Sequence, residues 1–163
     1  MKVHLLIFIL IFILILIIHS IDIIEIIEIK CNHTNRLGEY ERDIITRYIT
    51  TEYETAVNYL DDIDTIHFYM IDTKNDVLIS YFHITQSNDK YFINYAYTNE
   101  KYRNKGYMKK LLSYSLDVCK DLNIEKVYSW TKLTNKNSQK LFTSMKFQTD
   151  SIEDGNITFV MYL

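Results

Sequence analysis

The sequence predicts an α/β sandwich built on a mixed, mainly antiparallel β-sheet. The first observation is a two-residue hydrophobic period in three successive stretches rich in Ile, Val, Phe, Tyr and Thr: Ile66–Asp72, Val77–Thr85 and Lys90–Thr98. Short polar segments separate these stretches, so they predict an antiparallel meander. The second observation is a change to a helical period over Tyr107–Asn123, followed by another strand at Lys126–Trp130. A strand, a helix and a strand in succession predict a parallel crossover in the same sheet.

The remaining elements follow from the same patterns. A helical region precedes the meander, because apolar residues recur at spacings of three and four between Ile45 and Leu60. Cys31–Asn35 is polar, which predicts a loop. A second amphipathic helix begins after Thr134 or Asn135, either of which would cap it.

Length and composition indicate one domain. The chain has 163 residues, a net charge of -3, no proline, 3 glycines and 14 tyrosines. This length suits a single hydrophobic core, and the negative net charge argues against general nucleic-acid binding. Ile, Asn and Lys are abundant, and their A/T-rich codons indicate an A/T-rich genome. The five histidines form no ligand cluster, so no metal site is expected.

Residues 1–20 predict a hydrophobic anchor or signal-like segment, followed by a domain at residues 21–163. Leu5–Ile18 is an unbroken run of Leu, Ile and Phe. A spanning helix needs about 20 apolar residues and a signal-peptide core about 7–15. No small-residue cleavage site follows the run, so three interpretations stay open: an uncleaved anchor through residues 3–18, a signal peptide, or an extension that is seldom translated. We expect a membrane-anchored protein with a cytosolic domain, or a cytoplasmic protein if the segment is an artefact.

The most informative stretch joins the third strand of the meander to the helix after it. It sets five cations against a single acid, Glu100: Lys101, Arg103, Lys105, Lys109 and Lys110. A helix N-terminus carries unpaired N–H groups and a partial positive charge, so it normally favours acidic side chains. Cations at such an end indicate an anionic ligand such as phosphate, with a solvated basic loop as the alternative. Gly106 is followed by Tyr107-Met108, and this excludes the Gly-Lys-Ser/Thr loop of nucleotide triphosphatases.

Two motifs carry a resemblance to a known family. The stretch Arg103–Met108 resembles the acyl-CoA loop of the GNAT superfamily of N-acetyltransferases, Arg/Gln-x-x-Gly-x-Gly/Ala. Arg103 and Gly106 match this pattern, while Met108 stands where the family has a small residue. The stretch Asn135–Phe147 resembles the family's helix pattern, Asn-x-x-Ala/Ser-x-x-Leu-Tyr-x-x-x-Gly-Phe.

The second motif matches at four positions and departs at two. The matching residues are Asn135, Ser138, Leu141 and Phe147. Phe142 replaces a Tyr that protonates the departing CoA thiolate in the family, and Lys146 replaces a Gly. Phe142 keeps the ring but has no proton to give.

The resemblance implies a GNAT-like α/β sandwich from about Ile23 to Leu163. It implies a first strand near Ile23–Cys31 and a closing hairpin made of Phe147–Ile152 and Asn156–Leu163. It also implies acetyl-CoA as acyl donor, with the pyrophosphate on the loop, the pantetheine arm on the end of the preceding strand, and the Asn on the far wall. The residues assigned to the cofactor in this way are Tyr97, Thr98, Arg103, Asn104, Lys105, Gly106, Tyr107, Met108 and Asn135.

The resemblance therefore predicts an N-acetyltransferase whose amine acceptor and catalytic residues are unknown. No Asp or Glu lies between Asp89 and Glu100, so the strand before the loop supplies no carboxylate base. His67 and His83 lie on neighbouring strands and could relay a proton. Alternative acids are the tyrosines Tyr95, Tyr97, Tyr107 and Tyr128. The alternative functions are an acetyl-CoA-binding pseudo-enzyme and a membrane-tethered interaction module without turnover.

Overall fold

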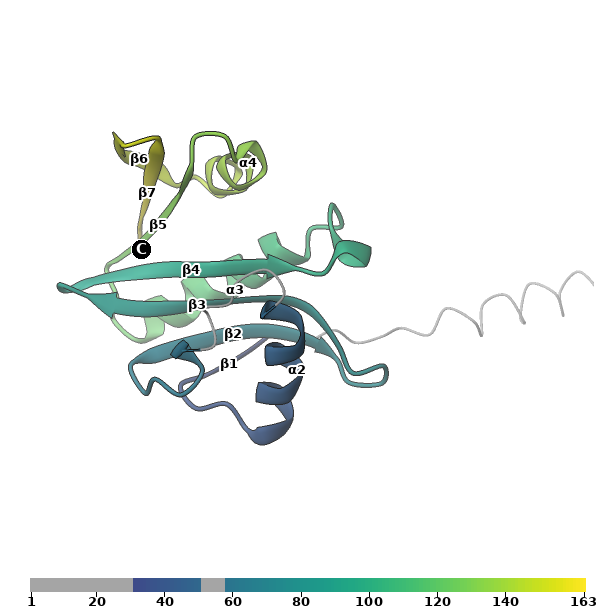
Figure 1. Ribbon diagram of the computed structural model, residues 1–163. Coiled ribbons are helices and arrows are strands. Elements are labelled where there is room, and N and C mark those ends of the chain that lie inside the picture. The colour runs from purple at the N-terminus through teal and green to yellow at the C-terminus, as the bar shows by residue number, and fades with distance from the viewer. Residues whose placement is uncertain (1–30, 51–57) are drawn as a thin grey trace, which may run out of the picture.

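The computed structural model describes residues 31–50 and 58–163. These residues form a seven-stranded sheet with helices on both of its faces (Figure 1). The elements in chain order are β1 (Asn32–Thr34), α2 (Glu39–Ile49), β2 (Thr65–Asp72), β3 (Val77–Ser87), β4 (Lys90–Thr98), α3 (Tyr107–Asp121), β5 (Lys126–Lys132), α4 (Lys136–Ser144), β6 (Gln148–Glu153) and β7 (Asn156–Tyr162). A short 3₁₀ turn, Glu100–Tyr102, lies between β4 and α3.

The sheet has the strand order β1-β2-β3-β4-β5-β7-β6. Among the described strands, β4 and β5 are parallel and the other neighbouring pairs are antiparallel. The crossover between β4 and β5 is α3, as the succession of strand, helix and strand requires. The predicted mixed, mainly antiparallel sheet with an α/β sandwich architecture is therefore confirmed.

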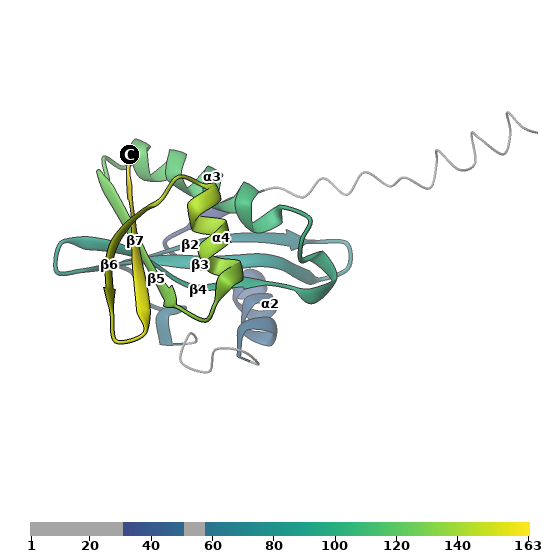
Figure 2. The same cartoon turned by 90° about the horizontal axis from the view of Figure 1, so that it is seen from above.

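Two hydrophobic cores lie on opposite faces of the sheet, and both depend on the two-residue period of β2 and β3. Phe68 and Phe82 belong to the core that α3 and α4 cover. Tyr69 and Tyr81 alternate with them and belong to the core that α2 covers. Figure 2 shows α2 and α3 on opposite sides of β2, β3 and β4.

The parallel pair β4 and β5 is joined over a short distance only. Its register pairs Tyr91–Ile93 with Val127–Ser129, whereas β4 continues to Thr98 and β5 to Lys132. Figure 1 shows β5 turning away from β4 beyond this ladder. On its other side β4 has an irregularity: its register against β3 shifts between Asn94 and Tyr97, and Tyr95 has a positive φ of 52°. A bulge of this kind bends a strand and re-aims its side chains.

One sequence-based assignment was wrong, and three expected elements lie partly or wholly outside the described residues. Cys31–Asn35, expected as a loop, contains the edge strand β1, which pairs with β2. The expected helical region contains α2, which begins at Glu39, and residues 51–57 of that region are not described. The predicted strand at residues 23–31 and the hydrophobic segment at residues 1–20 also fall, almost wholly or wholly, outside the described range. Within that range, no helix is both long enough and apolar enough to cross a membrane.

Candidate active site

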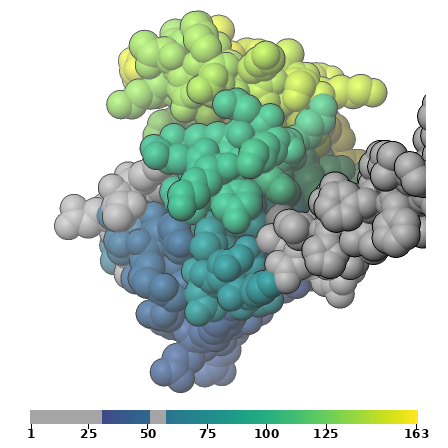
Figure 3. Space-filling model, turned by 90° about the vertical axis from the view of Figure 1, so that its right-hand side faces the viewer, coloured from purple at the N-terminus to yellow at the C-terminus, as the bar shows by residue number. Residues whose placement is uncertain are grey.

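The candidate site lies at the carboxyl ends of β4 and β5, where these two parallel strands diverge. The cationic loop and α3 follow β4, whereas Asn135 and α4 follow β5. Ligands in α/β proteins bind outside the carboxyl ends of parallel strands at such a divergence. In Figure 3, the loop and the start of α3 form the green surface between α2, in blue, and the α4 region, in yellow-green. The sequence-predicted cofactor residues therefore converge on one end of the sheet from two strands.

Gly106 sets the point at which α3 begins. It is the N-cap residue and has a φ of 82°, in the left-handed region that favours glycine. A Cβ atom on it would meet nothing within 4 Å, so the backbone conformation, and not lack of space, favours glycine here. Asn104 also has a positive φ, of 61°, which asparagine tolerates better than most residues. The strand, loop and helix start predicted from the sequence are thus confirmed.

The N-terminus of α3 has the electrostatics of an anion site. The helix has 15 residues, and its first turn, which the structure describes in full, contains no acidic side chain. Lys109 and Lys110 lie in that turn, and Lys105 precedes it with its Nζ 5.5 Å from the ring centroid of Tyr102. The helix dipole and these cations add their positive potential at one place. The arrangement suits a phosphate or pyrophosphate group.

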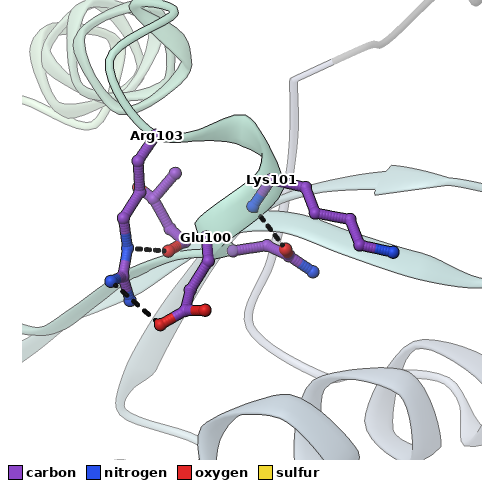
Figure 4. Close-up of polar contacts among 5 residues, drawn as sticks. Glu100, Lys101 and Arg103 are labelled. Atoms are coloured by element: carbon purple, nitrogen blue, oxygen red, sulfur yellow. Dashed lines mark hydrogen bonds and ion pairs between the residues drawn. The ribbon is translucent and has the colours of Figure 1, made fainter.

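The Arg103 side chain folds back onto the end of β4. Its Nε donates a hydrogen bond to the backbone oxygen of Thr98 at 2.9 Å, and its Nη1 lies 3.4 Å from Glu100 Oε1 (Figure 4). The Asn99 side chain holds the same turn, because its Oδ1 accepts a hydrogen bond from the Lys101 N–H at 3.1 Å. The guanidinium therefore fixes the loop to the strand. Its predicted contact with a pyrophosphate stays a prediction.

Tyr97 and Thr98 lie at the end of β4, beyond its ladder with β5. Tyr97 is buried in the core beneath α2, where its ring lies 6.3 Å from that of Tyr48. The Thr98 hydroxyl lies 3.3 Å from that of Ser80 on β3. Their side chains thus hold this end of β4 against β3 and α2, and their predicted role in binding a pantetheine arm would fall to the backbone.

Asn135 caps α4, as the sequence predicted. Its Oδ1 accepts a hydrogen bond from the Ser138 N–H at 3.1 Å. Gln139, one turn further, donates from Nε2 to the backbone oxygens of Lys132 and Leu133, at 3.2 and 2.8 Å. These bonds fix the start of α4 to the end of β5. The contact of Asn135 with a cofactor is not tested by them.

The two departures in the second motif lie in α4 and in the turn that ends it. The Phe147 N–H bonds to the Phe142 oxygen and the Lys146 N–H to the Thr143 oxygen, both at 3.0 Å. This is a Schellman motif, in which Lys146 takes the left-handed conformation, with a φ of 69°. Phe142 is 4% exposed, and its ring centroid lies 5.1 Å from that of Phe147 and 5.4 Å from that of Phe159. Phe142 is therefore a core residue.

The histidines suggested as proton carriers are brought together in the core beneath α2. His67 on β2 and His83 on β3 are directly opposite in the register, and both are fully buried. The Tyr81 hydroxyl lies between them, 3.0 Å from His67 Nδ1 and 3.1 Å from His83 Nδ1. Burial lowers the pKa of His67 to about 4 and that of His83 to about 3, and it raises the pKa of Tyr81 far above its usual value.

The candidate tyrosines are spread over the molecule. Tyr95 occupies the bulge of β4, with its ring 5.2 Å from that of His83. Tyr107 opens α3 and packs against Tyr102, whereas Tyr128 packs against Phe92. Sequence reasoning missed the link that Tyr81 makes. The two-residue period of β3 was the available signal, because it places residues 81 and 83 on one face.

Two further features bear on the location of the site. A cavity of about 430 Å³ lies between the turn that precedes β4 and the loop that precedes β5, at the opposite end of these strands from the cationic loop. It therefore takes no part in the candidate site. Among the described residues, no group of three His, Cys, Asp or Glu side chains could hold a metal ion.

Comparison with known proteins places the chain in a family. The model of the acetyltransferase (GNAT) family matches residues 36–147, which is more than half of the chain. A search of curated proteins finds no match. Similar solved structures include NAA60 from Arabidopsis thaliana in complex with a bisubstrate analogue, which has a TM-score of 0.64 and 13% identity and covers 82% of this chain and 98% of its own.

Two further structures have the same fold. The ribosomal-protein-S18-alanine N-acetyltransferase of Escherichia coli has a TM-score of 0.65 and 12% identity over 82% of this chain and 94% of its own. The PaiA N-acetyltransferase of Thermoplasma acidophilum, in complex with coenzyme A, has a TM-score of 0.62 and 12% identity over 82% of this chain and 99% of its own. At this identity the likeness shows the fold, and the matching family model shows the membership. The chain belongs to the GNAT family of acetyltransferases.

Proposed function

We propose that this protein is an N-acetyltransferase that takes an acetyl group from acetyl-CoA and transfers it to an amine. The observation that carries the proposal is the loop between β4 and α3. It places Lys105, Lys109 and Lys110 around a helix N-terminus at the point where β4 and β5 diverge. Family membership supports acyl transfer in general, whereas the acetyl donor and the amine acceptor belong to the proposal.

The residues present fit an acyl-CoA in a specific way. Gly106 leaves open space at the helix start, and the dipole of α3 with its flanking lysines suits a diphosphate. Arg103 would act partly through the loop, since it already fixes the loop to Thr98. Backbone groups near Tyr97 would hold the pantetheine arm, and the start of α4 at Asn135 would close the opposite wall. Bound acetyl-CoA would supply the activated acetyl group.

The remaining chemistry is proton transfer. The attacking amine must lose a proton and the departing thiolate must gain one. Phe142 has no hydroxyl and its ring is packed between Phe147 and Phe159, so it supplies no proton. Any protein acid must therefore come from another residue, or the thiolate takes its proton from water.

The buried Phe142 also favours a second candidate, a protein that binds acetyl-CoA without turning it over. Met108 in the loop is the other departure at a position expected to contact the cofactor. Both candidates predict CoA binding, and only the first predicts release of free CoA in the presence of an amine. The amine acceptor of this chain does not follow from the solved acetyltransferases of similar fold, because they share only 12–13% of its sequence.

The test of the loop is a comparison of two ligands by calorimetry on the full chain. CoA contains the pyrophosphate, and pantetheine shares the thiol-bearing arm without it. The double variant Arg103→Ala, Lys105→Ala should weaken CoA binding about tenfold or more, because contacts with charged groups contribute about 1.5–3 kcal/mol each. Pantetheine binding should change little.

A matched control removes two exposed cations that lie outside the loop. Lys120→Ala with Lys140→Ala lowers the net charge by the same amount, so CoA affinity should stay close to that of the unaltered protein. Equal losses of affinity for CoA and pantetheine in the loop variant would show that the loop does not bind the phosphates. Turnover is then measured as thiol release with a panel of small amines, peptides and amino sugars.

A further inference from the structure

A chain of three polar side chains crosses the core beneath α2. His67, Tyr81 and His83 all have no exposed surface. His67 and His83 face each other across β2 and β3, and Tyr81 lies two residues before His83 on the same face. The hydroxyl of Tyr81 is within hydrogen-bond distance of the Nδ1 atoms of both histidines, at 3.0 and 3.1 Å. Buried polar groups are costly, so a chain of this kind needs every bond in it to be made.

The geometry requires the two histidines to be opposite tautomers. A tyrosine hydroxyl has one proton to donate, and it can also accept a hydrogen bond. One histidine must therefore donate from Nδ1–H to the Tyr81 oxygen, and the other must accept the Tyr81 proton at Nδ1. The first histidine then has a lone pair at Nε2 and the second has a proton there. The chain thus has a proton-accepting end and a proton-donating end.

The two ends of the chain lie in different surroundings. The Nε2 atoms of both histidines have no hydrogen-bond partner among the described residues. The His83 ring lies 5.2 Å from the ring of Tyr95 and pairs in register with Asn94, one residue beyond the last β4–β5 pair at Ile93. This end is therefore next to the bulge of β4, where the strands diverge.

The His67 end lies toward the charged edge of the α2 face. Arg42 on α2 and Asp61 and Asp62 before β2 act on His67 electrostatically, the arginine disfavouring its cation and the two carboxylates favouring it. Asp62 also favours the cation of His83, so the interactions with Arg42 and Asp61 distinguish the His67 end. Arg42 and Asp61 form an ion pair whose side chains are 37% and 71% exposed. The chain thus runs from the bulge of β4 to a group of charges in contact with water.

We propose that His83, Tyr81 and His67 form a proton relay that takes the proton of the acceptor amine from the divergence of β4 and β5 to the charged edge at Arg42, Asp61 and Asp62. The proposal rests on the proposed acetyl transfer and adds to it the path of one proton. In this proposal His83 takes the proton from the amine, and Tyr81 and His67 carry it onward.

The transfers balance without any further reactant. As the amine nitrogen forms its bond to the acetyl carbon, its N–H bond breaks and the proton passes to His83 Nε2, which has no other hydrogen-bond partner among the described residues. His83 Nδ1–H passes to the Tyr81 oxygen, and the Tyr81 proton passes to His67 Nδ1. His67 releases its Nε2 proton at the charged edge. The thiolate that leaves the acetyl carbon takes one proton from water, so the reaction has no net proton change.

The burial of His67, Tyr81 and His83 favours the passage of a proton between neutral groups over a lasting charge on any of them. Because both histidines are neutral at neutral pH, each can accept a proton at one nitrogen while it gives one up at the other. A fixed cation in this core would instead need a buried counter-ion.

The first test needs no substrate, and it uses variants only to assign the signals. Long-range ¹H–¹⁵N NMR of the full chain labelled at histidine reads the tautomer of each ring from its nitrogen shifts. We expect one Nδ1–H and one Nε2–H histidine at residues 67 and 83, assigned with His67→Gln and His83→Gln. Two Nε2–H rings, or a cationic ring at neutral pH, would overturn the relay, because the Tyr81 hydroxyl could then complete only one of the two bonds.

The second test compares Tyr81→Phe with Tyr69→Phe. Tyr69 is opposite Tyr81 in the register and in the same core, so it controls for loss of a tyrosine hydroxyl from this core. Tyr81→Phe should lower kcat by about 10²-fold, the lower range for general acid–base catalysis, and should abolish the solvent deuterium isotope effect on kcat. The KM for acetyl-CoA should not change, and Tyr69→Phe should behave like the unaltered protein.

The outcomes separate the relay from the function on which it rests. Turnover that is unchanged in Tyr81→Phe, with its isotope effect intact, would overturn the relay and leave acetyl transfer standing. CoA binding by the unaltered protein without turnover of any amine would overturn the proposed reaction, and the catalytic role of the relay with it. If Tyr81→Phe fails to fold, the tautomers of the unaltered protein decide.

Discussion

At the scale of single residues, Lys146 has a conformation that a lysine rarely adopts. Its φ of 69° completes the Schellman motif at the end of α4. The left-handed conformation strains a residue that has a Cβ by about 1–2 kcal/mol. Glycine avoids this strain but loses more conformational entropy on folding, so its net advantage is smaller. The family pattern has glycine here for this reason. The side chain of Lys146 is exposed, and its unusual feature is its backbone conformation. We therefore expect this residue to affect the stability of the Schellman motif more than the chemistry of the site.

We expect Lys146→Gly to raise the free energy of unfolding by about 0.5–1 kcal/mol, because it relieves the left-handed strain. The measurement is urea denaturation of the variant and the unaltered protein. Lys140→Gly is the matched control: it removes an equally exposed lysine inside α4 and should lower stability by about 1 kcal/mol. A loss of stability in both variants would contradict the account of residue 146.

Phe142→Tyr tests whether the ring at residue 142 belongs to the core or to the site. Since the ring lies between Phe147 and Phe159, we expect the added hydroxyl to lower the free energy of unfolding by about 1–3 kcal/mol and to leave turnover no faster. Thermal melts and thiol release measure the two quantities. Faster turnover with undiminished stability would show that the hydroxyl reaches the thioester, and that the family's tyrosine can be restored.

At the scale of elements, the strand–loop–helix unit could be predicted and the bulge could not. The period of two in β4 and the period near 3.6 in α3 fixed both elements, with Gly106 marking the start of the helix. The bulge at Tyr95 leaves no pattern in the sequence, because only a change of register against β3 defines it. The period of β3 places Tyr81 and His83 on one face, but the contact of the Tyr81 hydroxyl with His67 depends on the register between β2 and β3. Side-chain contacts across strands depend on register, which the turns and the core decide together.

Gly106 and Gly155 give a matched pair for testing the loop. Their φ values are 82° and 75°, and in both a Cβ would meet nothing within 4 Å. Each Gly→Ala change should therefore cost a similar amount, about 1 kcal/mol, by strain alone. Only Gly106→Ala should also weaken CoA binding, since Gly155 lies in the β6–β7 turn, away from α3. Calorimetry with CoA and denaturation measure the two effects, and equal CoA affinity in both variants would argue against close approach of the ligand at residue 106.

At the scale of the whole molecule, the buried histidines make stability depend on pH. The folded pKa values, about 4 for His67 and about 3 for His83, lie below the value near 6.5 of an unfolded histidine. Below pH 6.5 the unfolded chain therefore binds more protons, and stability falls as pH falls through the window from 6.5 toward 4.

We expect the free energy of unfolding to fall by about 1–2 kcal/mol for each of these histidines between pH 7 and pH 5. Urea denaturation at a series of pH values above 5 measures this while most carboxylates stay ionised. The double variant His67→Gln, His83→Gln should flatten the dependence, and His33→Gln, which changes a histidine on β1, should keep it. The same slope in all three proteins would show that other groups cause it.

The short ladder between β4 and β5 has a consequence for how the molecule holds together. Three residue pairs, from Tyr91–Val127 to Ile93–Ser129, are the hydrogen-bonded seam between a four-stranded half and a three-stranded half of the sheet. A seam this short opens at lower cost than the long antiparallel ladders on either side of it, so the core that α3 and α4 cover is what mainly joins the two halves. A ligand bound across the divergence of β4 and β5 would contact both halves of the sheet and hold them together. Saturating CoA should then slow amide hydrogen exchange across β5 and β7 as well as in the loop that we propose binds it.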